Sequence, residues 1–461
     1  MNWGAVVSAM LPEHLLLAGI VLLIMIEIAS DKPRGGLVVS LATVAAAAVA
    51  AWGLYSSGQT IAAFPGQYSI DPAGALAKAL VLGLAVPVLL MSRDDFADGP
   101  FHLLLLSSLY GFCLLLSSDS FLTLFLGLEL MSIPVYVLVL LAFVRTESAE
   151  AALKYLVLGG AATAMFLMGA SLLYGGSGSL AISAFATALG ARDTMAIAAV
   201  VLVLTSFFLK AAIVPFHAWA PDAYEGASVP VTAYMATIIK AGVLLAALRL
   251  FGTAPVARPI VDLLAVLPLV SIVWGNLTAM RQGSFRRMIA YSSIAHAGYL
   301  FYAFLGDGAG RFQAVVFYLA AYGVMNLLAF ASLPPAADDA SRDRLDGLKG
   351  LFQRRPFAAV AIGIAMLSLA GIPPFPGFAA KFLIFKNVIA AGYTLYAVLG
   401  LVGSYLGIYF YLRVIQYMFM SGGEPAADHA APRTLALSAG LLCLVAVIAL
   451  TVFPGVFLGL V

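Results

Sequence analysis

The sequence predicts an all-helical integral membrane protein with about fourteen transmembrane helices. Hydrophobic residues make up 63% of its 461 residues and charged residues only 10%, whereas soluble proteins carry roughly 25% charged residues. The apolar residues are gathered into runs of about 20, the length at which an α-helix crosses a hydrocarbon core of about 30 Å. Proline-rich breaks interrupt two of these runs. We therefore expect one polytopic membrane domain that spans residues 1–461.

Each apolar run predicts one helix, and the loops between the runs are short. The first run is read as a retained span, because it lacks a basic leader and a persuasive cleavage site. The longest polar stretch, 334–356, is too small to fold separately. The predicted spans are 12–30, 36–55, 72–92, 101–118, 120–143, 150–174, 194–216, 228–250, 259–280, 286–305, 312–333, 357–388, 392–419 and 434–459.

Spans seven and twelve are expected to be discontinuous helices. Proline lacks a backbone donor and clashes with the preceding turn, so the freed carbonyl groups need partners that lipid cannot supply. Lys210 lies five residues before the first break and Lys381 five residues after the second, so the order of lysine and proline is reversed. The breaking residues are Pro215 in span seven and Pro373, Pro374, Pro376 and Gly377 in span twelve.

The two broken spans are five helices apart and so cross the membrane in opposite directions. Discontinuous helices at corresponding positions of two inverted halves indicate a transport site near the bilayer midplane. We therefore expect two inverted five-helix repeats. The expected divisions are N-terminal helices over 1–100, a first repeat over 101–250, a second repeat over 259–419 and a C-terminal helix over 434–461.

Five ionisable side chains lie inside the apolar runs. A charge at a helix centre costs about 2.5 to 3.5 kcal/mol on insertion scales, so such residues are expected to face a polar interior and to carry function. We predict that they form a proton relay, or a path that guides a cation. They are Glu129, Lys154, Lys210, Lys240 and Lys381.

Glu129 is expected to pair with Lys210, because a buried carboxylate and a buried ammonium reduce each other's burial cost. A static ion pair that only fixes helix packing is the alternative. Lys154 lies early in its span, where its stem can also reach the interface. Lys78 and Lys386 lie near the ends of other spans and are therefore expected to be interfacial anchors. Glu27 is expected to have the same role.

His217 and His296 are further candidates for the relay, since histidine titrates near neutral pH. Either is otherwise a hydrogen-bonded packing residue. No His, Cys or carboxylate pair appears at HExxH or CxxC spacing, so no metal site is expected. Cys113 and Cys443 lie in apolar runs and are expected to be buried rather than joined in a disulfide. The glycine-rich turn at 175–180 is too weak a signal for a nucleotide site. The net charge of +2 and the scattered basic residues give no sign of nucleic-acid binding.

Basic residues gather in the odd-numbered loops, which predicts that these loops face the cytoplasm and that both termini lie outside. With the span ends that adjoin them, those loops hold Lys32, Arg34, Arg93, Arg145, Arg281, Arg286, Arg287, Arg342, Arg344, Lys349, Arg354, Arg355 and Arg433. The even-numbered loops hold Arg192, Arg249, Arg258 and Arg311.

The chain resembles the antiporter-like subunits of bacterial proton-pumping NADH:quinone oxidoreductase, respiratory complex I. The resemblance covers most of the chain and is weaker over the first hundred residues. Within that family it is closer to the N type, because its PDAYEGASVPVTAY lacks a motif usual in the M and L types and Lys381 stands where the M type carries glutamate. The segments that carry the resemblance are GLELMSIPVYVL, KYLVLGGAATAMFLMGASLLYG, FFLKAAIVPFHAWAPDAYEGASVPVTAYMATIIKAG, RRMIAYSSIAHAGYL and MLSLAGIPPFPGFAAKF.

The resemblance implies that the five charged residues form the hydrophilic axis of a proton-translocating subunit in the bacterial inner membrane. It implies no cofactor in this chain, with NAD, FMN, iron–sulfur clusters and quinone (ubiquinone or menaquinone) bound elsewhere in the complex. The implied partners are other antiporter-like and small membrane chains and the peripheral redox arm. Two alternatives remain at this point, a subunit of a multi-subunit sodium or potassium/proton antiporter and a membrane scaffold without a transport role.

Overall fold

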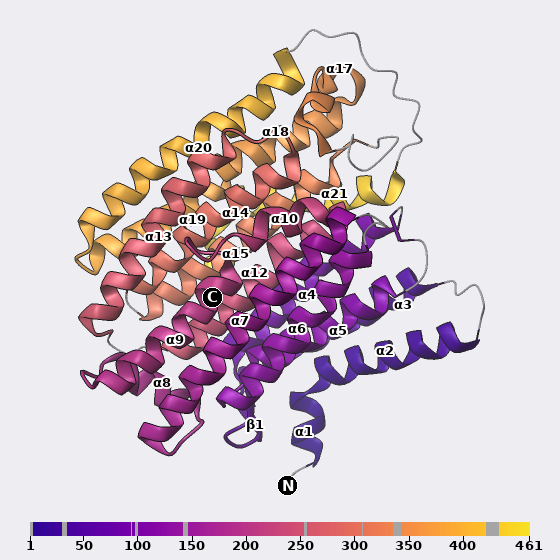
Figure 1. Ribbon diagram of the computed structural model, residues 1–461. Coiled ribbons are helices and arrows are strands. Elements are labelled where there is room, and N and C mark those ends of the chain that lie inside the picture. Colours follow the sequence, from indigo (N-terminus) through magenta and orange to yellow (C-terminus); the bar gives the residue numbers. More distant parts are fainter. Residues whose placement is uncertain are drawn as a thin grey trace. The chain divides into compact units, whose positions relative to one another are not determined.

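Helices make up almost all of the computed structural model of the protein (Figure 1). The structure describes residues 3–29, 35–93, 95–96, 100–141, 146–252, 256–306, 308–334, 343–420 and 433–461. Four of the basic residues behind the predicted orientation, Lys32, Arg34, Arg145 and Arg342, lie outside these ranges.

Twelve helical stretches in the described residues are long and apolar enough to cross a membrane. Two shorter apolar helices, Phe101–Leu116 and Pro356–Ala370, accompany them. Each of the fourteen predicted spans coincides with one of these helices or with a pair of helices. The chain is thus a multi-pass helical membrane protein, while the number of crossings and the inverted repeats stay predictions.

The chain divides into two compact units, and the first comprises Met1–Leu89, Phe96–Ala211 and Ile238–Asp262. Within it, α5 packs along α6, α7 along α9, and α2 against α3 and α5. Gly111 permits the close approach of α5 to α6, since a Cβ there would lie 2.3 Å from the backbone nitrogen of Met131. The helices of this unit are α1 (Trp3–Ala9), α2 (Leu11–Ala29), α3 (Gly36–Ser57), α4 (Pro72–Ser92, of which Leu90–Ser92 belong to the second unit), α5 (Phe101–Leu116), α6 (Phe121–Leu141), α7 (Thr146–Ser177), α8 (Ile182–Leu189), α9 (Thr194–Ala211) and α12 (Lys240–Phe251).

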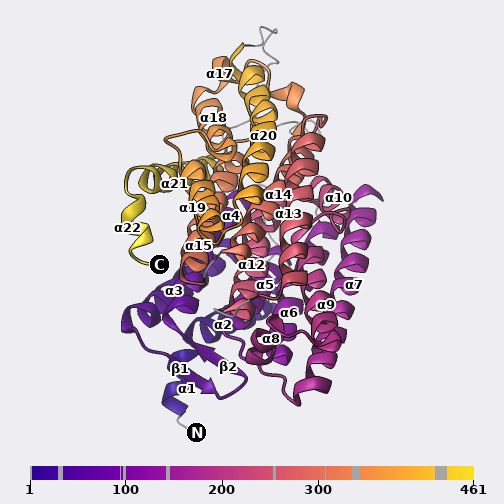
Figure 2. The ribbon, with the colours of Figure 1, turned by 90° about the vertical axis from the view of Figure 1, so that its left-hand side faces the viewer.

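A short antiparallel hairpin in the first unit is an addition to the predicted all-helical fold. It consists of β1 (Ile61–Phe64) and β2 (Tyr68–Ile70), with Ile61 opposite Ile70. Figure 2 shows the two strands beside α1. In the sequence, this segment falls between the predicted spans 36–55 and 72–92, where no strand was predicted.

The second unit comprises Leu90–Asp95, Ala212–Thr237 and Leu263–Val461. Its centre is α15, which packs against α18, α19 and α21, while α18 also packs against α20. Its helices are α10 (Trp219–Gly226), α11 (Val229–Tyr234), most of α13 (Arg258–Ala279), α14 (Phe285–Tyr302), η2 (Ala303–Leu305), α15 (Gly308–Ala331), η3 (Leu345–Leu348), α17 (Leu351–Arg354), α18 (Pro356–Ala370), α19 (Pro376–Ala390), α20 (Thr394–Met420), α21 (Thr434–Val452) and α22 (Pro454–Leu458).

Both predicted helix breaks are present. The helix α9 ends at Ala211, and the next residue, Ala212, has φ +62°. The helix α18 ends before Gly371, which has φ +82°, and α19 begins at Pro376. A left-handed residue turns the chain out of the helical path, and proline at the first position of a helix sacrifices no helical hydrogen bond. The sequence therefore located both breaks correctly.

Candidate functional site

Glu129 and Lys210 form the ion pair that the sequence predicted. The Lys210 Nζ lies 3.1 Å from the Glu129 Oε1, and both side chains are largely buried. The same carboxylate oxygen accepts a hydrogen bond of 2.6 Å from the Thr163 hydroxyl. One oxygen of Glu129 on α6 thus gathers donors from α7 and α9, which places an acid and a base at the meeting point of three helices.

The broken helix explains the position of Lys210. Lys210 is the penultimate residue of α9, where the last carbonyl groups of a helix lack partners and the helix dipole favours a cation. The nearby hydroxyl of Ser132 lies 3.4 Å from its Nζ. The ammonium group can therefore be stabilised in more than one position along α6.

Lys240 is the first residue of α12 and is 5% exposed. A π-helical turn, η1 (Met235–Ile239), immediately precedes it. Single π-turns inside helices occur frequently at functional sites, because they displace the backbone hydrogen bonds of the helix. The structure thus places Lys240 at a buried irregularity, in agreement with the position predicted for it.

Lys381 occupies the second break. Its Nζ donates hydrogen bonds of 3.0 Å to the Ala370 carbonyl oxygen and 3.0 Å to the Ser404 hydroxyl, and it lies 5.0 Å from the centre of the Tyr299 ring. Ala370 is the last residue of α18, so its carbonyl group is one of those that the break leaves without a helical partner. Gly371 leaves room for the lysine stem, because a Cβ there would lie 3.0 Å from Lys381.

Gly377 lets the two halves of the second break pack together. A Cβ at this position would lie 1.8 Å from the Ser368 carbonyl oxygen, a separation that no side chain can occupy. The backbone nitrogen of Gly377 also donates to the Ser368 hydroxyl at 3.1 Å. The glycine therefore fixes the start of α19 against the end of α18 and thereby positions Lys381.

His296 lies in a buried network of hydroxyl groups. Its Nδ1 is 2.7 Å from the Tyr318 hydroxyl and its Nε2 is 3.1 Å from the Tyr411 hydroxyl, which is 2.5 Å from the Ser292 hydroxyl. A neutral imidazole donates through one nitrogen and accepts through the other. The ring thus links α15 to α20, an arrangement that serves both predicted roles, proton relay and hydrogen-bonded packing.

Tyr299 connects the His296 network with Lys381. Its ring centre is 5.6 Å from that of His296, and its hydroxyl accepts a hydrogen bond of 3.1 Å from the Asn276 amide. The ammonium group of Lys381 lies over the same ring. The second unit therefore holds one continuous group of polar side chains around its broken helix.

His217 and Lys154 have other surroundings. The His217 Nε2 accepts a hydrogen bond of 3.1 Å from the Trp274 indole. Lys154 is paired with Glu150 at 2.6 Å, one helical turn earlier on α7, and 43% of its side chain is exposed. Both residues stay predicted members of the relay, and the position of Lys154 also fits the interfacial alternative.

The prediction that Lys78 is an interfacial anchor is wrong. Its side chain and that of Glu13 are both 0% exposed, and the Lys78 Nζ lies 2.6 Å from the Glu13 Oε1. The available signal in the sequence was that the run 12–30 holds two acidic residues, Glu13 and Glu27, while the run 72–92 holds Lys78. Run length alone could not show that α2 and α4 bring the two charges together.

Within the described ranges, no group of three or more His, Cys, Asp or Glu side chains is placed to hold a metal ion. Cys113 and Cys443 are free, and both are buried, as their places in apolar runs predicted. The carboxylate, amine, imidazole and hydroxyl groups described above can all exchange protons.

Comparison with known proteins gives consistent matches. Residues 118–407 match the family described as NADH:quinone oxidoreductase/Mrp antiporter, transmembrane. A protein of Pelobacter propionicus named NADH-quinone oxidoreductase subunit N is 38% identical over 97% of both chains. A protein of the same name from Trichlorobacter lovleyi is 36% identical over 93% of this chain and 91% of its own length.

Solved structures share the fold. A chain of respiratory complex I from Thermus thermophilus matches with a TM-score of 0.84 and 35% identity, over 97% of this chain and 98% of that chain. A chain of the Mrp complex from Dietzia matches with a TM-score of 0.83 and 24% identity, over 98% of this chain and 96% of that chain. The second likeness concerns the fold alone.

Proposed function

The chain belongs to the NADH:quinone oxidoreductase/Mrp antiporter family, and on that basis we propose that it is the N-type proton-translocating membrane subunit of an NADH:quinone oxidoreductase. The relatives named subunit N align over nearly the whole chain, which supports this subunit type. The structural observation that carries the proposal is the ion pair of Glu129 and Lys210 beside a broken helix.

The ion pair provides a means of moving a proton. While Glu129 and Lys210 are in contact, each charge stabilises the other in a poorly solvated interior. When the pair opens, the ammonium group loses that stabilisation and gives up its proton more readily. A change in partner subunits that separates the two side chains would therefore drive a proton onward from Lys210.

Lys240 and Lys381 continue the relay in this proposal, and the hydroxyl groups around His296 add proton-exchanging groups close to Lys381. Lys154 and His217 are peripheral members. Breaks in the helices supply the carbonyl acceptors that hold a lysine inside the membrane, as the Ala370 carbonyl does for Lys381.

Electron transfer takes place in partner subunits. NAD, FMN, the iron–sulfur clusters and quinone belong to those partners, and this chain itself binds no cofactor. The proposed partners are antiporter-like and small membrane chains and the peripheral redox arm. The proposed location is the bacterial inner membrane, with both termini on the periplasmic side because basic residues gather in the opposite loops.

Single substitutions test the proposal in the assembled complex. Glu129→Gln or Lys210→Met should reduce proton pumping coupled to NADH oxidation roughly tenfold or more, since a positioned proton-transfer group is lost. Lys386→Met is the matched control, because Lys386 is exposed on α19 and lies outside the proposed relay. Pumping in inverted membrane vesicles is the measurement, and wild-type pumping by both single variants would refute the role of the pair.

A sodium or potassium/proton antiporter subunit is the second candidate, because the matched family description includes Mrp antiporters. The relatives named NADH-quinone oxidoreductase subunit N favour the first candidate. Purification of the native assembly distinguishes them. Companion chains with flavin and iron–sulfur clusters support the oxidoreductase, whereas an assembly of membrane chains alone supports the antiporter.

A further inference from the structure

A second buried acid–base cluster lies in the first unit, outside the proposed relay. It consists of Glu13 on α2, Tyr68 on β2 and Lys78 on α4. The Lys78 Nζ lies 2.6 Å from the Glu13 Oε1 and donates to the Tyr68 hydroxyl at 3.0 Å. The Tyr68 hydroxyl in turn donates to the same Glu13 oxygen at 2.7 Å. The three groups thus form a closed triangle of hydrogen bonds.

Only one of the two carboxylate oxygens of Glu13 accepts hydrogen bonds from the part of the chain that the structure describes. Its Oε1 accepts from both Lys78 and Tyr68, while its buried Oε2 has no hydrogen-bond partner among the described residues. A buried carboxylate oxygen without a donor is costly. A water molecule at Oε2 would complete the site: it can donate to the carboxylate, accept from the O–H of the protonated acid, and carry the proton between these two states.

A purely structural contact explains the cluster poorly. Replacing a fully buried ion pair by apolar side chains of similar volume is often neutral or stabilising, and an ionisable residue on a transmembrane helix indicates a functional site by default. Burial also raises the pKa of the Tyr68 hydroxyl. Tyr68 therefore stays protonated at neutral pH and keeps donating to Glu13.

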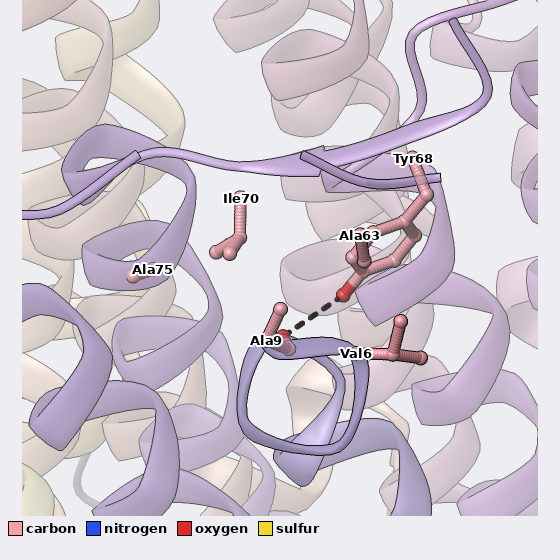
Figure 3. Packing of buried hydrophobic residues seen from close by; sticks show 6 residues of the cluster. All are labelled: Val6, Ala9, Ala63, Tyr68, Ile70 and Ala75. Carbon is pink, nitrogen blue, oxygen red and sulfur yellow. Dashed lines mark hydrogen bonds between the residues drawn. The ribbon is translucent and has the colours of Figure 1, made fainter. Parts of the chain in front are cut away.

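The site is closed on the side of the hairpin. A small apolar cluster of Val6, Ala9, Ala63, Ile70 and Ala75 surrounds Tyr68, and Figure 3 shows the Tyr68 hydroxyl pointing from β2 toward Ala9 at the end of α1. Besides Lys78 and Tyr68, the titratable groups of Cys113 and Tyr110 on α5 are near enough to Glu13 to interact with it electrostatically.

We propose that Glu13, Lys78 and Tyr68 form a second proton-binding site of this subunit, in which Glu13 takes up a proton on Oε2 while Lys78 and Tyr68 hold Oε1. Uptake converts the Glu13 carboxylate to a carboxylic acid and leaves the Lys78 ammonium unchanged, so the site gains one positive charge. Release returns that proton to water or to the next group. This proposal rests on the proposed function and adds a site among the N-terminal helices.

Infrared difference spectroscopy of the assembled complex detects this proton directly. The spectrum of the complex during turnover should contain the C=O stretch of a protonated carboxylic acid, and Glu13→Gln should remove that band. Glu27→Gln on the same helix is the matched control, since Glu27 is exposed, and it should leave the band in place. A band that persists unchanged in Glu13→Gln would overturn the proposal.

The complex with Glu13→Gln can fail to assemble, because Lys78 then lacks its carboxylate partner. Two further variants keep the test decisive in that case. Tyr68→Phe retains both charges and the ring, and it should shift the frequency of the carboxylic acid band, because Glu13 loses one donor. Glu13→Gln combined with Lys78→Met removes both charges, and it should lower proton pumping roughly tenfold. An unmoved band in Tyr68→Phe, or wild-type pumping in the double variant, would identify a static ion pair.

The Glu129→Gln variant, measured in the same vesicles, separates this proposal from the proposed function. Loss of pumping in Glu129→Gln together with normal pumping in the Glu13 and Lys78 double variant refutes only the second site. Normal pumping in both single variants, Glu129→Gln and Lys210→Met, refutes the role of that pair on which the proposed function depends, whatever the Glu13 variants show.

Discussion

Buried lysines in this protein differ in how their charge is stabilised. Lys210 and Lys78 each contact a carboxylate, whereas Lys381 is held by a carbonyl oxygen, a hydroxyl group and an aromatic ring. A neutral set of partners holds an ammonium group without trapping it in an ion pair. Lys381 is therefore suited to pass a proton on rather than to store it.

Lys381→Met should abolish coupling at the second break. The variant leaves the Ala370 carbonyl without its donor and removes the exchangeable group, so proton pumping should fall roughly tenfold or more. Pumping by reconstituted complex is the measurement. Lys386→Met on the same helix is the control, and equal pumping by the two variants would contradict the assignment.

His296→Phe tests the hydroxyl network around Lys381. The substitution keeps an aromatic ring but removes both nitrogen atoms that meet Tyr318 and Tyr411. The buried Tyr318 hydroxyl thereby loses its bond to His296 at a cost of about 1 to 3 kcal/mol, while the Tyr411 hydroxyl keeps its contact with Ser292. If His296 relays protons, pumping should fall more than the thermal stability of the assembly accounts for. A packing role predicts a lower melting temperature with unchanged pumping per assembled complex.

At the scale of the elements, proline and glycine residues in the sequence indicate where both helices are interrupted. Pro376 begins α19, and Gly377 lets it touch the end of α18. The spacing of five residues between Lys381 and Pro376 has a physical reason, because it brings the amine back to the last carbonyl group of the preceding helix.

Gly377→Ala should destabilise the second break. The added Cβ overlaps the Ser368 carbonyl oxygen, so α19 must shift away, at a cost of about 1 to 3 kcal/mol. Gly363→Ala on α18 is the control, since its nearest neighbour lies at an ordinary 3.7 Å. Thermal unfolding of the assembled complex measures the difference, and equal stability of the two variants would contradict this geometry.

The β-hairpin is attached to the end of α12, the helix that carries Lys240. Arg249 donates to the Ser69 hydroxyl of β2 at 3.0 Å, and it also donates to the Ser118 carbonyl oxygen at 2.6 Å and to Asp119 at 2.8 Å. Arg249→Met should therefore loosen the hairpin and speed amide hydrogen exchange at residues 61–70. Arg258→Met on α13 should leave that exchange unchanged, and slow exchange in both variants would show that the hairpin is held by other contacts.

On the scale of the whole molecule, the sequence predicted most of the fold. The length of the apolar runs was enough to locate the long helices, because a bilayer requires about 20 apolar residues per crossing. The pairing of Glu129 with Lys210 was also predictable, since a lone buried carboxylate requires a cation. The division into repeats and the orientation stay predictions.

Tertiary contacts set the limit of the sequence-based prediction. Lys78 lies six residues after the start of α4, a position from which a lysine stem can also reach the interface, so only the approach of α2 showed its burial. Lys154 is the opposite case, because it lies on an exposed face of α7, where it pairs with Glu150 instead of being buried. Side-chain direction, which depends on packing, decided both.

The central claim is that protons cross at Glu129 and Lys210 while electrons move in partner subunits. Reconstituted complex carrying Glu129→Gln together with Lys210→Met tests it most directly, because this double variant leaves no unpaired charge behind. Protons translocated per NADH oxidised is the quantity to measure. The account predicts a fall of roughly tenfold or more, and a wild-type ratio in this variant would contradict it.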